Sequence, residues 1–194
     1  MIAIRPLVTL AAAIVATSVV QGVAAGIQTA SNTPKQEFTA NAVNMSNVGT
    51  PGASQVEITV DAYTTEAARD RLMEIFRKEG DTGLLRALQN ERPVGSIRAP
   101  GSLAYDLRYA RELPGEDGGR RLILATDRPI GFGEASGNPR TRDYPFTLIE
   151  LRLDGDGRGE GRLSIATKLT LNANVLVIEN YADQPVMLTN VRRR

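Results

Sequence analysis

The sequence predicts an α+β fold dominated by an antiparallel β meander, either barrel-like or a strongly curved sheet, with about eight or nine strands. Most of the chain from residue 38 to the end alternates apolar and polar residues, which is the period of two typical of half-buried strands. Short turn segments rich in Gly, Pro, Asn and Asp separate these stretches and favour a meander. The stretch near residues 65–90 changes to the helical period and predicts a helical insertion.

The first 25 residues are typical of a secretory signal peptide. One charge, Arg5, precedes an uncharged apolar run over residues 7–20, and small residues at Val23 and Ala25 suit cleavage after Ala25. The run is shorter than the roughly 20 residues that a membrane span needs. We therefore expect a signal peptide over 1–25, a flexible leader over 26–37 and a single α+β domain over 38–194. The expected location is periplasmic or extracellular, with no stable membrane insertion after cleavage.

The charge of the mature chain is balanced. Removing Arg5 leaves 22 basic residues (23 minus 1) against 22 acidic ones. Because nucleic acids and anionic membranes are held by an excess of Lys and Arg, we expect no nucleic-acid partner. The chain has no cysteine, so its stability must come from the core.

The predicted elements begin with two strands, over residues 38–43 and 56–63, joined by a loop. Thr64 or Thr65 is a suitable cap for the helix that follows, and Gly80 is a suitable end for it. A second short helix should begin at Asp81.

The remainder of the chain predicts strands only. Residues 103–113 and 120–130 form a hairpin around a Pro-Gly-rich turn, and the first of these strands should place four residues on one face: Leu103, Tyr105, Leu107 and Tyr109. Four further strands follow, over residues 146–153, 162–171, 175–181 and 186–191.

The segment from Asp154 to Gly161 contains two aspartates and four glycines. A calcium loop would need six to eight oxygen ligands, and Arg158 and Arg162 fall at ligand positions, so we interpret the segment as a turn. Its four glycines should supply the positive φ angles of a hairpin loop. We expect no metal site here.

The residue types that are missing restrict the chemistry. The chain has neither histidine nor cysteine, which excludes the Ser-His-Asp and Cys-His mechanisms and the usual zinc sites. The glycines near residue 131 lack the spacing of a dinucleotide fingerprint, and no P-loop occurs, so we expect no cofactor. We assign no catalytic residue, although paired carboxylates can work without histidine.

A binding site is predicted in the longest connection between strands, residues 131–145, because long loops on a rigid sheet often bind ligands. Its arginines could hold a carboxylate or phosphate. Alternatively, Arg140, Arg142 and Asp143 pair with one another and with strand-face residues such as Asp127 and Glu150, and only hold the loop down. The candidate residues are Glu134, Asn138, Arg140, Arg142, Asp143 and Tyr144.

Four stretches, "GSIRAPGSLAYDLRYAREL", "LATDRPIGF", "DYPFTLIELRL" and "EGRLSIATKL", together resemble a family of small uncharacterised exported bacterial proteins. The resemblance covers about residues 38–191. It implies bacterial export and an α+β domain, and it carries no activity, cofactor or catalytic residue.

Two functions remain open. The first is a non-enzymatic exported module that binds a small-molecule ligand or an exported protein partner. The alternative is a hydrolase or isomerase that uses carboxylates and arginine, with Glu134 or Asp143 as acid or base. Two facing carboxylates in a pocket would favour the enzyme, whereas a barrel filled by side chains would favour partner binding.

Overall fold

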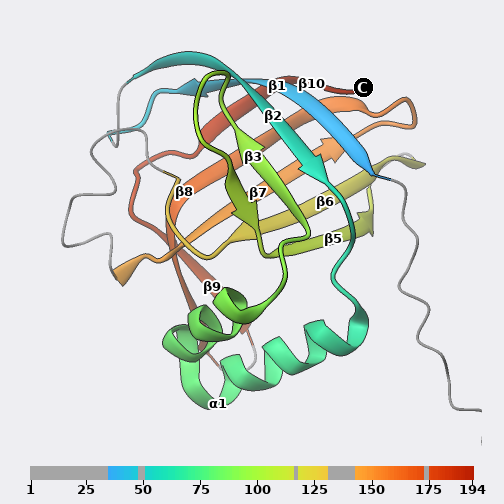
Figure 1. Ribbon diagram of the computed structural model, residues 1–194. Coiled ribbons are helices and arrows are strands. Elements are labelled where there is room, and N and C mark those ends of the chain that lie inside the picture. Colours follow the sequence, from blue (N-terminus) through green and yellow to red (C-terminus); the bar gives the residue numbers. More distant parts are fainter. Residues whose placement is uncertain (1–34, 48–50, 116–117, 131–142, 173–174) are drawn as a thin grey trace, which may run out of the picture. The chain divides into compact units, whose positions relative to one another are not determined.

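The computed structural model describes residues 35–47, 51–115, 118–130, 143–172 and 175–194. Within these ranges one ten-stranded antiparallel sheet curves into a nearly closed barrel, and one helix packs against it (Figure 1). The predicted fold class is therefore confirmed. The predicted signal peptide and most of the predicted leader lie outside the described residues.

The elements follow in chain order as β1 (Gln36–Asn44), β2 (Gly52–Val60), α1 (Glu66–Asn90), β3 (Gly95–Arg98), β4 (Tyr105–Leu107), β5 (Tyr109–Pro114), β6 (Arg120–Thr126), β7 (Phe146–Leu153), β8 (Arg158–Asn172), β9 (Val175–Asn180) and β10 (Val186–Arg193).

Two connections close the sheet into a barrel: the pairing of β1 with β10, and the direct passage of the chain from β4 at one edge of the sheet to β5 at the other. Neighbouring strands run in the order β4-β3-β2-β1-β10-β8-β7-β6-β5, and β9 pairs with β8 beside this path. The pairing of β1 with β10 joins the first and the last strand, which lie side by side in Figure 1. At the other junction only Arg108 separates β4, which pairs with β3, from β5, which pairs with β6. The Arg108 N–H donates to the Ala125 carbonyl at 2.8 Å, so the chain changes partner without leaving the barrel wall.

The interior of the barrel is filled by apolar side chains. Alternate residues of each strand point inward, as the burial of every second residue of β1 and of the second half of β2 shows. The largest of the fully buried side chains come from strands all around the barrel: Phe38, Ile58, Leu107, Leu122, Leu124, Ile149, Leu151, Leu163, Ile165 and Leu188. Because the chain has no cysteine, burial of these apolar side chains, rather than disulfide bonds, stabilises the fold.

The helix covers part of the outer wall. Thr65 caps it, since its Oγ1 accepts from the Ala68 N–H at 3.2 Å, and Gly80 interrupts it with a φ of 67°, both as predicted. Four residues with helical spacing, Leu72, Phe76, Leu84 and Leu88, form a second apolar cluster with Phe146 of β7 and Leu169 of β8. No helix within the described ranges is both long and apolar enough to cross a membrane.

Two predicted details are wrong. Residues 103–113 do not form one strand, because the change of partner at Arg108 reverses the inward face: Leu107 and Ala110 are both fully buried, whereas Leu103 lies before β4 and is 90% exposed. In the Gly-rich segment, Gly157 has a positive φ of 76°, but Gly159 and Gly161 belong to β8. They are glycines because their neighbours leave no room: a Cβ on Gly159 would lie 1.8 Å from the Arg152 carbonyl oxygen.

Candidate functional site

The loop predicted as a binding site is described only at its end. Its residues Glu134, Asn138, Arg140 and Arg142 lie outside the described residues, and Asp143 is exposed. The Tyr144 hydroxyl donates to Glu179 of β9, and the Tyr144 ring packs against Tyr181 with 5.6 Å between centroids. Tyr144 is therefore in contact with the segment at β9.

The carboxylates proposed to hold that loop down have partners elsewhere. Arg108 Nε lies 3.5 Å from a carboxylate oxygen of Asp127. Arg152 Nε lies 3.1 Å from Glu150 Oε1, and Arg121 Nη1 lies 3.7 Å from the same oxygen. Glu150 thus connects β6 and β7 on the outer wall. Its partners Arg121 and Arg152 belong to a group of arginines outside the predicted loop.

These arginines line an open cleft between the tips of two hairpins, which we call the arginine cleft. The β5–β6 tip and the β7–β8 tip meet at one end of the barrel because neighbouring strands are antiparallel. The cleft has a volume of about 520 Å³. The residues that line it include four arginines and one aspartate: Arg120, Arg121, Arg152, Arg158 and Asp154.

Strand register brings the four arginines together. Arg121 of β6 lies directly opposite Arg152 of β7, and Arg120 lies opposite Leu153. Leu153 in turn faces Gly159 of β8, which has no side chain to fill the cleft. Like charges directly opposite one another on a sheet are unfavourable, so the Arg121–Arg152 pair is placed there at a cost to stability.

The β7–β8 turn carries Arg158 to the cleft. The Asp154 Oδ1 accepts from the backbone N–H of Asp156 at 2.9 Å and from that of Arg158 at 2.8 Å. The Asp154 carbonyl accepts from the Gly157 N–H at 3.1 Å. Asp154 is therefore a turn residue, as predicted, and its carboxylate shapes the loop.

The arginines of the cleft differ in how well they are paired. Arg121 and Arg152 share Glu150, and the buried Nε of Arg121 has no hydrogen-bond partner among the described residues. The Arg158 guanidinium makes no hydrogen bond or ion pair with any side chain that the structure describes. A buried donor without a partner is unfavourable. An anion that draws the Arg121 side chain toward the cleft would supply one.

Arg120 belongs at the same time to a closed set of four polar side chains at this end of the barrel, which we call the polar ring. The Gln36 Nε2 donates to the Tyr63 hydroxyl at 2.9 Å, and the Tyr63 hydroxyl donates to Glu112. Arg120 Nη1 donates to Gln36 Oε1 at 2.8 Å and to Glu112 Oε2 at 3.2 Å. Burial and the hydrogen bond to Glu112 raise the pKa of Tyr63 to about 12.

The polar ring closes the end of the barrel. Gln36, Glu112 and Arg120 occupy inward positions, one or two residues beyond the apolar lumen, and the Arg120 guanidinium also lies 5.9 Å from the centre of the Phe38 ring. Its polar groups satisfy one another, so the ring needs no ligand. Arg120 therefore belongs both to the polar ring and to the lining of the arginine cleft.

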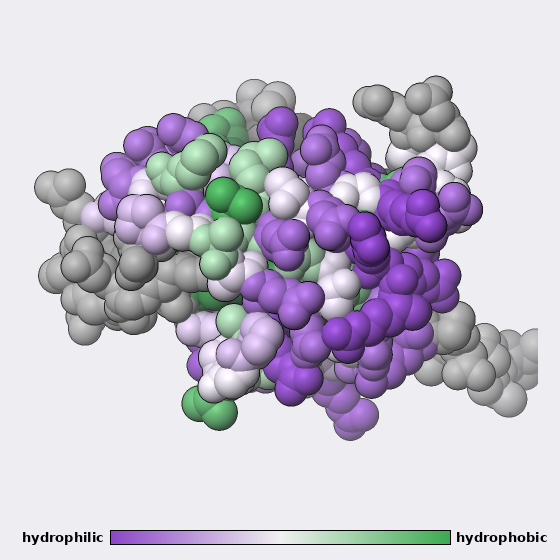
Figure 2. Space-filling model, turned by 90° about the horizontal axis from the view of Figure 1, so that it is seen from above, coloured by the Kyte–Doolittle hydropathy of each residue, from purple (hydrophilic) through white to green (hydrophobic). Residues whose placement is uncertain are grey.

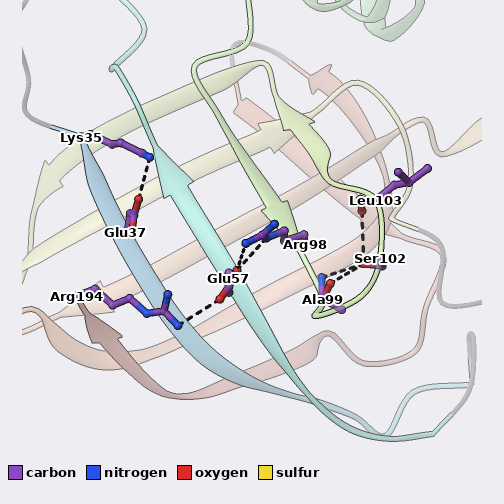
Figure 3. Close-up of polar contacts among 8 residues, drawn as sticks. All are labelled: Lys35, Glu37, Glu57, Arg98, Ala99, Ser102, Leu103 and Arg194. Carbon is purple, nitrogen blue, oxygen red and sulfur yellow. Dashed lines mark hydrogen bonds and ion pairs between the residues drawn. The ribbon is translucent and has the colours of Figure 1, made fainter.

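A second charged surface lies on the outer face of β1, β2 and β3, and we call it the paired face. Figure 3 shows Glu57 of β2 between Arg98 of β3 and Arg194 at the end of the chain. Arg98 Nη2 lies 2.6 Å and Arg194 Nη2 lies 3.2 Å from the Glu57 carboxylate. The hydrogen bond and the charge of Arg98, followed by the charge of Arg194, lower the pKa of Glu57. Nearby, Lys35 and Glu37 form another pair, at 2.8 Å.

Hydrophilic and hydrophobic residues are unevenly distributed over the molecular surface. Figure 2 views the molecule from above relative to Figure 1. Hydrophilic residues predominate in its right-hand part, and hydrophobic residues are more frequent in its upper left part.

The arginine cleft was missed by sequence reasoning. Its members are scattered over residues 120–158, and the balanced net charge concealed them. The predicted meander contained a usable signal, since it pairs the start of the 120–130 strand with the end of the 146–153 strand and so places Arg121 near Arg152. Planar guanidinium groups bind carboxylate, sulfate and phosphate through paired hydrogen bonds. Among the described residues no group of three or more Asp or Glu converges on a metal-sized site.

Comparison with family models, with curated proteins and with solved structures finds no match for this chain.

Proposed function

We propose that this protein is an exported, non-enzymatic binding module that recognises an anionic group of a small molecule or of an exported partner through the arginine cleft. The observation that carries the proposal is the gathering of four arginines and one aspartate around an open cleft of about 520 Å³. The proposed export, to the periplasm or the extracellular space, rests on residues 1–25 and on the resemblance to exported bacterial proteins.

The filled lumen supports surface recognition. Small-ligand barrels keep a cavity inside, whereas apolar side chains and the polar ring occupy the interior of this one. The ligand therefore meets the barrel at its end, where hairpin tips present side chains on a rigid support.

The alternative, a carboxylate- and arginine-dependent hydrolase or isomerase, has less support. Such chemistry needs a carboxyl group whose pKa is raised toward neutrality. Among the described residues, Glu37, Glu57 and Glu74 have carboxyl groups whose pKa is lowered, each chiefly by a hydrogen bond from a neighbouring cation. These groups are bases held in their charged form by ion pairs.

Calorimetric titration of the purified chain with sodium sulfate, at low ionic strength, tests the proposal. The wild-type protein should bind sulfate, and the double variant Arg152→Ala/Arg158→Ala should bind at least about tenfold more weakly. Its free energy of unfolding should change by about 1 kcal/mol or less, because exposed ion pairs contribute little.

The matched control is Arg77→Ala/Arg86→Ala, which removes the same charge from exposed positions of α1. If the control weakens sulfate binding as much as the cleft variant does, binding reflects net charge alone and the proposed site is wrong. Absence of sulfate binding to the wild type would also contradict the proposal. Intact-mass analysis of exported protein tests the proposed export, which requires a chain that begins near Gly26.

A further inference from the structure

The arginine cleft continues onto a charged outer wall. On β7 and β8 the outward residues beside the cleft are Glu150 and Arg152, then Arg158, Glu160 and Arg162. Arg162 lies opposite Glu150, and Glu160 lies opposite Arg152. Arg158 lies opposite Arg192 of the neighbouring strand β10. The cleft and this wall form one surface across β6, β7, β8 and β10, which we call the arginine wall.

The arginine wall has an excess of positive charge although the mature chain as a whole is neutral. Two glutamates, Glu150 and Glu160, face five arginines at its outward positions: Arg121, Arg152, Arg158, Arg162 and Arg192. The arginine side chains are accessible, with exposed fractions of 44% for Arg121 and 54% for Arg152. On the paired face, by contrast, three cations, Lys35, Arg98 and Arg194, lie against two carboxylates, Glu37 and Glu57.

The wall is also larger than a single anionic group. It spans three strand spacings, from β6 through β7 and β8 to β10, which amounts to about 14 Å at roughly 4.8 Å per spacing. One sulfate or carboxylate is much shorter than this span and cannot contact guanidinium groups at both ends of the wall. A ligand that neutralises the whole wall must carry several negative charges along its length.

The residue types of the arginine cleft and the arginine wall favour one class of polyanionic ligand. No aromatic residue lines the cleft or occupies the outward positions of the wall described above. Single-stranded nucleic acids depend on aromatic platforms on which their bases stack, and neutral sugars also favour aromatic faces. A carboxylated or sulfated polysaccharide requires only spaced cations. We propose that the arginine wall binds an acidic polysaccharide, with the arginine cleft as one of its subsites. This inference rests on the proposed function, because it assumes that the cleft binds anions.

Titration with oligogalacturonates of increasing length tests this proposal. Affinity should rise with chain length until the oligomer spans the wall. The double variant Arg162→Ala/Arg192→Ala, which changes the wall but leaves the cleft lining intact, should lower the affinity for the longest oligomer about tenfold. It should leave sulfate binding at the cleft unchanged, which separates this inference from the proposed function. The control is again Arg77→Ala/Arg86→Ala.

Three results would overturn the inference. An affinity that does not depend on oligomer length would limit the ligand to a single anionic group. An Arg162→Ala/Arg192→Ala variant that binds long oligomers like the wild type would exclude the wall. A duplex or single-stranded DNA of similar charge that binds more tightly at the same salt concentration would replace polysaccharide by nucleic acid. If the wild-type protein does not bind sulfate at all, in contrast, the proposed function itself is wrong.

Discussion

The barrel carries two charged surfaces that differ in how their charges are satisfied. On the paired face, Glu57 receives both Arg98 and Arg194, and Lys35 lies against Glu37 (Figure 3). In the arginine cleft, Arg121 and Arg152 likewise share one glutamate, at 3.7 and 3.1 Å, but Arg158 has no side-chain partner among the described residues. Surface ion pairs that are complete fasten strands and termini together, whereas an excess of one charge in a cleft is available for a ligand. The difference shows why local pairing is more informative here than net charge.

A substitution in the barrel lumen, beneath both charged surfaces, should change the free energy of unfolding most. Leu151 is fully buried in the lumen, so Leu151→Ala should lower the free energy of unfolding by roughly 2–5 kcal/mol through lost packing and a cavity. Denaturant unfolding measures this value. Leu103→Ala is the control, because Leu103 is 90% exposed and its truncation should have little effect. Equal losses in the two variants would mean that the barrel lumen is not the core.

The polar ring should give the next largest effect. Tyr63→Phe removes the acceptor of the buried Gln36 amide and the donor to Glu112, at a cost of about 1–2 kcal/mol at neutral pH. Because folding raises the pKa of Tyr63 from 10.0 to about 12, its contribution is present below pH 10 and is lost as the pH rises toward 12.

Unfolding curves of the wild type and of Tyr63→Phe should therefore converge between pH 10 and 12. Curves that stay parallel over this range would contradict a buried, hydrogen-bonded Tyr63. They would also mean that Tyr63 does not connect Gln36 and Glu112 in the polar ring.

The paired face should give the smallest effect, and one that depends on pH. The pKa of Glu57 is lowered in the folded protein by the hydrogen bond and charge of Arg98, so its stabilising contribution is present above its usual pKa of 4.5. The contribution is lost as the pH falls through the lowered value. Glu57→Gln should thus be slightly less stable than the wild type at neutral pH and equally stable in acid. A difference that grows in acid would show that Glu57 is not held as a carboxylate.

Much of the fold could be predicted from sequence. Alternation of Val56, Ile58 and Val60 located a strand, and Thr65 and Gly80 located the cap and the interruption of the helix, because these signals act within a few residues. The change of partner at Arg108 could not be predicted, since it depends on how the barrel closes. Residues 103–113 alternate regularly, yet their inward face reverses at that point.

The candidate site was harder to predict than the fold. Sequence reasoning favours a contiguous polar loop, and it selected residues 131–145, most of which the structure does not describe. The arginine cleft instead combines residues from two hairpins whose proximity depends on exact register, such as Arg121 opposite Arg152. A shift of one residue would turn these side chains into the lumen, so the pattern of a single strand cannot reveal the cluster.

The most direct test of the central claim compares the two surfaces in one experiment. Arginine side-chain Nε–H signals can be followed by NMR while sodium sulfate is added to isotope-labelled protein at low ionic strength. The account predicts saturable shifts for Arg121, Arg152 and Arg158, which line the arginine cleft, and small, unsaturated shifts for Arg98 and Arg194, which lie on the paired face. Equal shifts on both surfaces, or saturation at Arg98 and Arg194 alone, would contradict the claim that the arginine cleft is the binding site.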